Sequence, residues 1–300
     1  MLTKKFQKID AEIIVKELKE KGFFSFKNAI TNEVVNKIQQ DSTKSKLNLN
    51  NSKISGLYYE RQYFLTNLLT TSKEFYDFAT SKLVFKICKN FLGNTFRLKC
   101  QRYYETYGGH HMQWHTDNKD DRGPANIKGL IFIFYTEDVN DGQFQFIEGS
   151  HTWSGKKAYS DYSDAFIEKN YKDKIVDFKL PRGSLVIYNT YGIHRAKPVS
   201  NKSFSRKSVF FQVDNELSNA EPIILDTKFV TEINNEIAMF LGFGKPSNYD
   251  AYPTTSLKTL PFSRNMIFIL CKYIFYRVTL RAFYLLPKFF RAYIKKIIRR

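Results

Sequence analysis

The sequence contains little cysteine and no stretch typical of a secretory signal. Cys88, Cys100 and Cys271 show no CxxC spacing, and an odd count without a pattern argues against a disulfide framework. The first 22 residues are charged and helix-patterned, so they lack the apolar stretch of a leader peptide. From these absences we expect a protein of the reducing, cytoplasmic compartment.

Acidic residues are absent from the end of the sequence. The segment Arg264–Arg300 carries ten Lys and Arg and no Asp or Glu, in a chain whose formal net charge is +18. The first 263 residues therefore account for only +8, and more than half of the excess charge lies in the last eighth of the sequence. Such a tail should attract an acidic surface such as anionic lipid or nucleic acid.

Internal repeats with a period of 20–50 residues are also absent, which excludes a solenoid or propeller. Residues 1–92 show mainly helical patterning, with a polar loop at 41–56 and a helical stretch expected over 60–92. After Thr95, short β-branched and aromatic segments alternate with Gly, Asp, Asn or Pro, as strands do. This order predicts a mainly β sandwich or barrel with flanking helices.

Histidine is scarce, with five in the chain, but two of them occur in a pattern that suits a metal. In the run QWHTD, side chains alternate along a strand, so His115 and Asp117 share one face. His194 follows the strand-like stretch GSLVIYNT and is the best third ligand. Two imidazoles and one carboxylate on one side of an iron ion leave three coordination positions open. The alternative is an ordinary strand pair at His115 and Asp117.

An arginine twelve residues beyond His194 points to a second binding element. Arg206 opens the strand-like segment RKSVFFQV and Ser208 lies two residues on, so both side chains share a face. An arginine fork beside a hydroxyl suits a terminal carboxylate, and an iron triad with such a clamp is the equipment of a 2-oxoglutarate-dependent oxygenase. Gln101 and Tyr104, on an earlier candidate strand, are candidate cosubstrate contacts, with packing or surface roles as the alternative.

Several nearby residues have two interpretations. Trp114 alternates away from the ligands and is expected in the core, and His151 is expected to be structural, at the turn after a strand. His110 and His111 are interpreted as loop residues before the ligand strand, with a place at the mouth of the site as the alternative. For Tyr188, support of the ligands and simple packing carry equal weight.

Residues from about 10 to 215 resemble the phytanoyl-CoA dioxygenase family of Fe(II)/2-oxoglutarate-dependent oxygenases. The matching motifs occur in order: LKEKGFFSFKNAITNEVVNKI, WHTD, GQFQFIEGSH, LPRGSLVIYNTYGIHRAKP and NKSFSRKS. The resemblance implies a double-stranded β-helix (a cupin-like jelly roll), iron ligands at His115, Asp117 and His194, and a 2-oxoglutarate clamp at Arg206 assisted by Ser208. The family's usual Pro-containing segment before Gly-Ser-His is QFQFIE here, so coenzyme A ester substrates are not implied.

The activity implied by the resemblance is a dioxygenase that uses Fe(II), 2-oxoglutarate and O2. Its substrate is expected to be a small-molecule, lipid or sugar-like metabolite that is hydroxylated with release of succinate and CO2. The alternative from another class is a non-catalytic metal- or ligand-binding jelly-roll protein, tethered to a membrane or partner by its C-terminal helix. A cupin-like metal-dependent isomerase or hydrolase is a third interpretation, and it would not require Arg206.

The expected organisation has three parts. Residues 1–226 form the oxygenase domain, with a helical part at 1–92 and the jelly-roll core at 93–226. Residues 227–263 form a helical or linker segment, and residues 264–300 form a basic amphipathic tail. These boundaries follow from the change in pattern near residue 93 and from the loss of any family likeness after about 226.

The tail is expected to lie on a membrane rather than to cross it. From Arg277 to Arg299 the basic residues recur with helical spacing, and the other faces are aromatic and aliphatic, which suits a helix in a membrane interface. The longest uncharged run has seven residues, against ~20 for a span, and Pro287 should kink the helix. Packing on the domain or in a dimer is the alternative, and nucleic acid is disfavoured because the apolar face is too large. The expected location is cytoplasmic, on the inner face of a membrane if the tail binds lipid.

Overall fold

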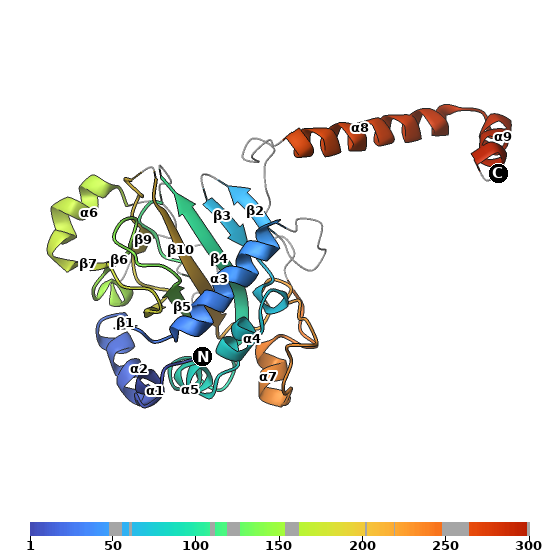
Figure 1. Ribbon diagram of the computed structural model, residues 1–300. Helices are drawn as coiled ribbons and strands as arrows, with labels where there is room; N and C mark the ends of the chain where they lie inside the picture. The colour runs from blue at the N-terminus through green and yellow to red at the C-terminus, as the bar shows by residue number, and fades with distance from the viewer. Residues whose placement is uncertain are drawn as a thin grey trace. The chain divides into compact units, whose positions relative to one another are not determined.

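The computed structural model describes residues 1–47, 56–59, 62–108, 112–118, 127–153, 162–201, 203–218, 220–247 and 264–298. The chain forms two compact units, Met1–Thr259 and Leu260–Arg300. In the first unit, two antiparallel sheets pack face to face and helices cover the outer face of the larger sheet (Figure 1).

The helices of the first unit begin where the sequence supplies capping side chains. The Asp10 carboxylate accepts a hydrogen bond from the Glu12 amide, which starts α2 at the predicted residue. The helices are α1 (Lys4–Gln7), α2 (Ala11–Glu20), α3 (Asn32–Leu47), α4 (Lys73–Ala79), α5 (Lys82–Leu92), α6 (Asp164–Tyr171) and α7 (Asn235–Phe240), with single 3-10 turns at η1 (Leu68–Thr70), η2 (Ser150–Thr152) and η3 (Lys172–Lys174).

The two sheets have seven and three strands. The larger sheet has the order β1-β8-β5-β10-β4-β3-β2 and the smaller has the order β7-β6-β9. The strands are β1 (Phe23–Phe26), β2 (Gly56–Tyr59), β3 (Gln62–Leu65), β4 (Arg97–Tyr107), β5 (Gly129–Tyr135), β6 (Phe144–Ile147), β7 (Ile175–Phe178), β8 (Leu185–Asn189), β9 (His194–Ala196) and β10 (Ser205–Asp214).

The segments of the core are divided between the two sheets, as in a double-stranded β-helix. Strands β4, β10, β5 and β8 are neighbours in the larger sheet. In the smaller sheet, β7, β6 and β9 are continued by an isolated antiparallel bridge between His115 and His194. The predicted jelly roll is therefore confirmed, and its connectivity delivers His115 and His194 side by side.

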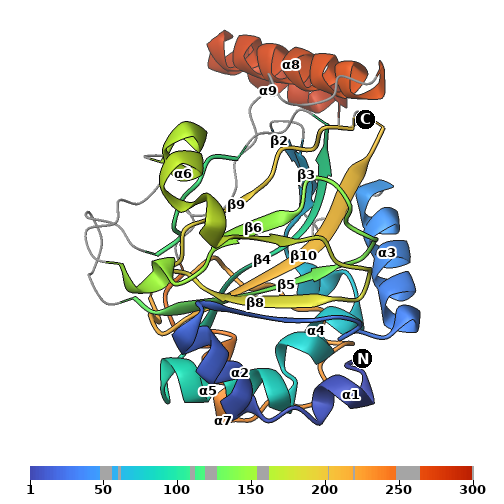
Figure 2. The same ribbon diagram turned by 90° about the vertical axis from the view of Figure 1, so that its left-hand side faces the viewer.

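Strand β5 separates two apolar layers, and all seven of its residues are buried. Leu130, Phe132 and Phe134 face the helices, whereas Ile131 and Ile133 face the smaller sheet. Figure 2 shows α1, α2, α4, α5 and α7 gathered along the helical face of the larger sheet. The opposite face, between the two sheets, is where a pocket can form.

One predicted segment differs from the structure. The first part of the expected helix at 60–92 is extended instead, since β3 pairs with β2 and with β4 at the edge of the larger sheet. The segment 227–263, predicted to be helical or a linker, contains α7. The Phe240 ring of α7 packs 4.9 Å from the ring of Phe85 and 6.0 Å from that of Phe96, measured between centroids. The described part of this segment therefore belongs to the first unit; residues 248–263 lie outside the described residues.

The second unit consists of α8 (Arg264–Leu285) and α9 (Lys288–Ile298). The two helices are separated at Leu286 and Pro287, where a proline lacks the N–H that a continuing helix needs. The predicted break at Pro287 is therefore present. Among the described residues, no helix combines the length and apolar character that a membrane-crossing segment needs.

Candidate metal centre

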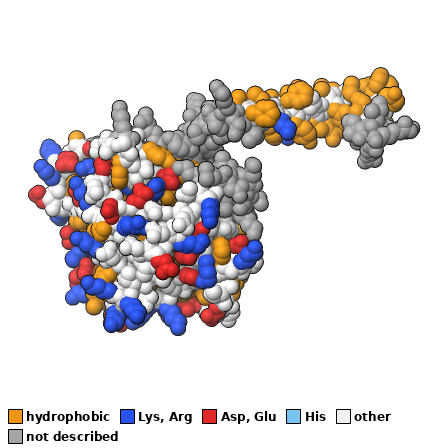
Figure 3. All heavy atoms as spheres, in the orientation of Figure 1, with side chains coloured by type: hydrophobic (Ala, Val, Ile, Leu, Met, Phe, Trp, Pro, Cys, Tyr) orange, Lys and Arg blue, Asp and Glu red, His pale blue; other side chains and the backbone are white. Residues whose placement is uncertain are grey.

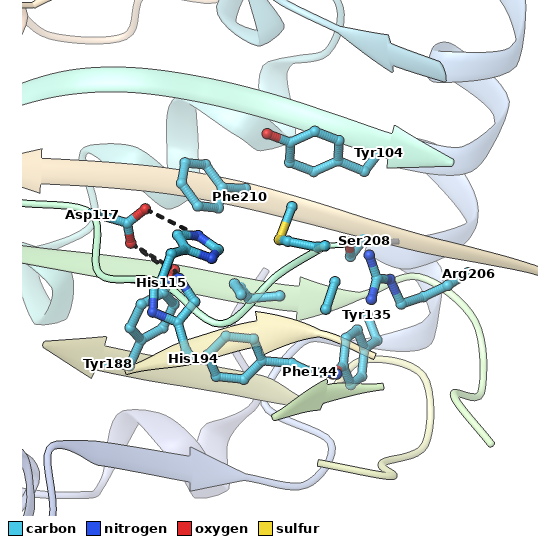
Figure 4. A pocket seen from close by; sticks show the side chains of 13 residues that line it. Tyr104, His115, Asp117, Tyr135, Phe144, Tyr188, His194, Arg206, Ser208 and Phe210 are labelled. Atoms are coloured by element: carbon cyan, nitrogen blue, oxygen red, sulfur yellow. Dashed lines mark hydrogen bonds and ion pairs between the residues drawn. The ribbon is translucent and has the colours of Figure 1, made fainter. Parts of the chain in front are cut away.

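His115, Asp117 and His194 come together in a pocket between the two sheets. Their ligand atoms all lie within 4.8 Å of one another. The Asp117 carboxylate places Oδ2 3.3 Å from His194 Nε2 and Oδ1 3.8 Å from His115 Nε2 (Figure 4). The three residues that the sequence predicts as ligands thus form one cluster, although Asp117 and His194 are 77 positions apart.

Backbone hydrogen bonds fix the cluster. The amide of His115 donates to the carbonyl of His194 over 3.0 Å, and the amide of His194 donates to the carbonyl of His115 over 2.9 Å. The amide of Asp117 donates to the carbonyl of Thr190 over 3.1 Å. The ligand segment is therefore bound both to β9 and to the loop after β8, which holds the three side chains in place.

The histidine tautomers are set by local carbonyl groups. His115 Nδ1 lies 2.8 Å from the carbonyl of Gln113, and His194 Nδ1 lies 3.0 Å from the carbonyl of Gly192. Because a carbonyl only accepts hydrogen bonds, each Nδ1 carries the proton and each Nε2 presents a lone pair to the cluster. Burial lowers the pKa of His194 to about 4, against the opposing effect of Asp117, so its imidazole is neutral near pH 7.

This donor set fits a ferrous ion. Two imidazoles that present Nε2 to the cluster, and one carboxylate, on one side of a metal ion leave positions open for further ligands. The hydroxyl of Tyr188 donates to Asp117 Oδ2 over 3.2 Å and also lies 3.2 Å from His194 Nε2. Burial raises the pKa of Tyr188 well above its usual value, so the phenol keeps the proton it donates.

Arg206 lies at the other end of the same pocket and is 5% exposed. One of its terminal nitrogens donates to the carbonyl of Gly142 and the other donates to Thr106 Oγ1 over 3.0 Å. Its Nε is buried without a hydrogen-bond partner, and no carboxylate among the described residues pairs with the guanidinium. Burial lowers the pKa of Arg206, so the group is a desolvated cation open to an anionic ligand.

The pocket has a volume of about 140 Å³ and mainly apolar walls. Figure 4 shows the His-Asp-His cluster at one side and Arg206 with Ser208 at the other. Besides these five residues, the walls consist of Tyr104, Met112, Ile133, Tyr135, Phe144, Tyr188, Ala196 and Phe210. The cation and the metal ligands therefore face a shared, mainly apolar space.

The predicted cosubstrate contacts separate into two groups. Tyr104 pairs with Ser208 across β4 and β10, and both line the pocket. Gln101 pairs with Phe211, which packs in the helical core, and it does not line the pocket. The prediction for Gln101 is therefore wrong, because positions 101 and 104 differ by an odd number and point to opposite faces of the strand.

The structure also shows where Trp114 and His151, two other residues discussed from the sequence, lie. Trp114 is fully buried, as expected, and the guanidinium of Arg195 lies 4.4 Å from its ring centroid. His151 Nε2 lies 2.9 Å from the carbonyl of Lys19, which agrees with a structural role after β6. His110 and His111 lie outside the described residues.

A polar network that the sequence did not indicate lies next to the ligand loop. Asn118 Oδ1 accepts from Lys99 Nζ over 3.0 Å and from Gln212 Nε2 over 3.2 Å, and Lys99 pairs with Asp214 at 3.0 Å. A Cβ on Gly129 would lie 2.2 Å from Asp214 Oδ1, so only glycine fits there. The network holds the residue that follows Asp117, and only the strand register shows that these groups meet.

Comparison with solved structures identifies the fold. HygX from Streptomyces hygroscopicus, with nickel and 2-oxoglutarate bound, matches with a TM-score of 0.54 and 14% identity over 74% of this chain and 90% of HygX. The non-heme alpha ketoglutarate dependent carbocyclase SnoK from nogalamycin biosynthesis matches with a TM-score of 0.54 and 12% identity over 74% and 90%. The epimerase SnoN, in complex with Fe3+, alpha ketoglutarate and nogalamycin RO, matches with a TM-score of 0.52 and 12% identity over 75% and 90%.

Comparison of sequences identifies the family. No curated protein sequence matches the chain. Residues 18–208, which are more than half of the chain and include all three clustered side chains, match the profile of the family described as phytanoyl-CoA dioxygenase (PhyH). The chain therefore belongs to the phytanoyl-CoA dioxygenase family.

Proposed function

We propose that this chain is an Fe(II)- and 2-oxoglutarate-dependent dioxygenase that hydroxylates a small-molecule, lipid or sugar-like metabolite. One observation carries the proposal: the His-Asp-His cluster and a buried arginine without a carboxylate partner occupy the same pocket. A metal site alone would equally suit a binding protein or a hydrolase. The guanidinium of Arg206, which no carboxylate of the described residues neutralises, favours an acidic ligand beside the metal. 2-Oxoglutarate is such a ligand.

Each group in the pocket has a separate task in this reaction. When bound, iron and 2-oxoglutarate supply oxidation of a C–H bond by O2, coupled to release of succinate and CO2. His115, Asp117 and His194 hold the metal, and the Nδ1 hydrogen bonds of the two histidines keep the rings oriented. In the same pocket, Arg206 binds the distal carboxylate of the cosubstrate, with the Ser208 hydroxyl beside it.

The apolar walls protect this chemistry and position the substrate. Phe144, Tyr188 and Phe210 line the space next to the metal ligands and exclude water, which strengthens the charge interactions of Arg206 and Asp117. Proteins of the same fold include a carbocyclase and an epimerase, so this scaffold supports several outcomes of C–H oxidation. Hydroxylation is the outcome that needs no further group from the protein.

The proposal is tested by succinate formation from 2-oxoglutarate with Fe(II) under air, for the wild type, Asp117→Ala and His151→Ala. We expect slow succinate release by the wild type and by His151→Ala, because His151 lies outside the pocket. We expect no release above background by Asp117→Ala. Equal release by Asp117→Ala and the wild type would contradict the proposal, as would a folded, iron-loaded wild type that forms no succinate with any metabolite pool supplied.

A further inference from the structure

The second unit presents apolar side chains to solvent to an unusual extent. No described side chain of α8 or α9 is buried. Eighteen large hydrophobic side chains are exposed among the described residues, and thirteen of them belong to this unit. Among them, Phe268, Phe275 and Leu285 are 70%, 71% and 87% exposed. Such a surface marks an interaction site, because a soluble chain rarely leaves a patch of this kind uncovered.

The charge of the unit has a single sign. Arg264–Arg300 contains ten basic residues and no acidic one. On the described part, Lys272, Arg277, Arg281 and Lys288 are exposed, interspersed with the aromatic side chains. A partner must therefore offer negative charge and apolar contact together. A second copy of the tail offers apolar contact only and adds like-charge repulsion.

Apolar residues on the first part of α8, before the predicted stripe begins at Arg277, face several directions. At about 100° per residue, Phe268, Tyr273, Ile274 and Tyr276 point in four directions around the helix axis. The break at Pro287 also prevents one stripe from running through both helices. The basic stripe predicted from Arg277 to Arg299 is therefore divided between α8 and α9, and its amphipathic character stays a prediction. Apolar side chains that face several directions, with Lys272, Arg277 and Arg281 among them, suit an anionic surrounding medium better than the groove of a protein partner.

Helix α9 has the opposite character and separates its two kinds of side chain. By the same geometry, Lys288 and Arg291 lie within about 60° of each other, whereas Phe289, Phe290 and Tyr293 gather within about 100° on the other side. Aromatic rings opposite a basic face are typical of helices that lie in the headgroup region of a bilayer. Long basic side chains can also extend from α8 to the headgroups while their stems contact acyl chains.

We propose that the unit Leu260–Arg300 docks on an anionic lipid bilayer surface, with α9 lying in the headgroup layer and the apolar circumference of α8 immersed beside it. Figure 3 shows how apolar side chains extend along α8 with a basic group among them. Anionic headgroups supply the negative charge, and the acyl boundary supplies the apolar contact. The inference is independent of the proposed oxidation chemistry, since it uses no residue of the pocket.

The test is co-sedimentation of the full-length protein with vesicles of phosphatidylcholine alone or mixed with phosphatidylglycerol. We expect binding to the anionic vesicles that weakens with added salt, and little binding to the neutral ones. The variant Arg277→Gln/Arg281→Gln/Lys288→Gln should bind the anionic vesicles about tenfold more weakly or worse. The variant Phe275→Ser/Phe289→Ser should also weaken binding, and both changes affect exposed side chains only, so folding is preserved.

A matched control removes the same charge from the first unit. Lys27→Gln/Lys82→Gln/Lys89→Gln changes three exposed lysines there and should leave vesicle binding within about twofold. Equal weakening by both triple variants would overturn the inference, because the attraction would then be a property of net charge. Absence of vesicle binding by the wild type would also overturn it. A concentration-dependent dimer that the Phe275→Ser/Phe289→Ser variant abolishes, without any lipid binding, would assign the surface to a second copy instead.

Discussion

At the scale of single residues, two buried arginines on neighbouring strands have opposite environments. The guanidinium of Arg102 forms a two-pronged ion pair with Glu221, and both side chains are less than 10% exposed. Arg206 is buried to the same degree but pairs with no carboxylate among the described residues. A carboxylate of the protein neutralises the charge of a structural arginine. A buried arginine without such a carboxylate can instead pair with an anionic ligand. From this contrast we propose Arg206, and not Arg102, as the residue that binds an anionic ligand.

The first prediction is that the same substitution at these two arginines has opposite effects on stability. Arg102→Met should destabilise the fold by about 3–5 kcal/mol, because Glu221 is left as an unpaired buried charge. Arg206→Met should leave the free energy of unfolding unchanged or raise it by about 1 kcal/mol, since it removes a desolvated cation. Chemical unfolding of the metal-free protein measures both. A loss of more than about 2 kcal/mol in Arg206→Met would show that Arg206 is mainly structural.

A second prediction concerns Tyr188, whose hydroxyl donates to Asp117 and lies beside His194 Nε2. Tyr188→Phe keeps the ring in its apolar surroundings but removes the hydrogen bond that orients the carboxylate. We expect Fe(II) affinity to fall about tenfold, the usual effect of removing such a supporting contact. The control is Tyr103→Phe, which removes a buried hydroxyl on the other face of the sheet. Unchanged Fe(II) affinity in Tyr188→Phe would reduce Tyr188 to a packing residue.

The sequence predicts correctly which side chains share a face of a strand, because that depends only on the two-residue period. His115 and Asp117 share a face because they are two positions apart, and Arg206 and Ser208 share one for the same reason. The same rule, applied from Tyr104, would have excluded Gln101. The support that Tyr188 gives to Asp117, and the contacts around Asn118, depend on strand register between distant segments, which no local pattern encodes.

At the scale of elements, the jelly roll and a helix within residues 227–263 were predictable, whereas the edge hairpin and the packing of α7 were not. The composition of the strands from β4 to β10, and the turn residues between them, predict these strands from the sequence. Strands β2 and β3 were not predicted from the sequence. Each has four residues, which are too few for the two-residue alternation of a strand to be recognised. Helix α7 is six residues long, and its membership of the first unit depends on tertiary contacts of Ile237 and Phe240.

The third prediction tests where the first unit ends. A chain ending at Asp226 loses α7, and with it Phe240, which is 1% exposed against Phe85 and Phe96. Loss of one buried phenylalanine costs about 3–5 kcal/mol, so the thermal midpoint should fall by about 10 °C or more. A chain ending at Thr259 should unfold at the same temperature as the full-length protein, within a few degrees. Equal thermal midpoints for the two shortened chains would show instead that the first unit ends at residue 226, as the sequence predicts.

At the scale of the whole molecule, chemistry and charge lie in different parts of the chain. The metal cluster, the arginine and the pocket belong to Met1–Thr259, whereas ten of the eighteen excess positive charges belong to Arg264–Arg300. The two parts can therefore be tested separately. Removing residues 260–300 should spare the formation of succinate while it abolishes attraction to anionic vesicles.

We expect one ferrous ion and one 2-oxoglutarate to bind together in the pocket of the intact protein. The most direct test is an anaerobic titration that follows the visible charge-transfer absorption of Fe(II) chelated by a 2-oxo acid. We expect one such complex per chain in the wild type and in Arg182→Met, whose arginine lies outside the pocket. We expect no complex in His115→Ala and a 2-oxoglutarate affinity at least about 100-fold lower in Arg206→Met. An unchanged absorption titration in His115→Ala or Arg206→Met would contradict joint binding of the metal and 2-oxoglutarate in this pocket.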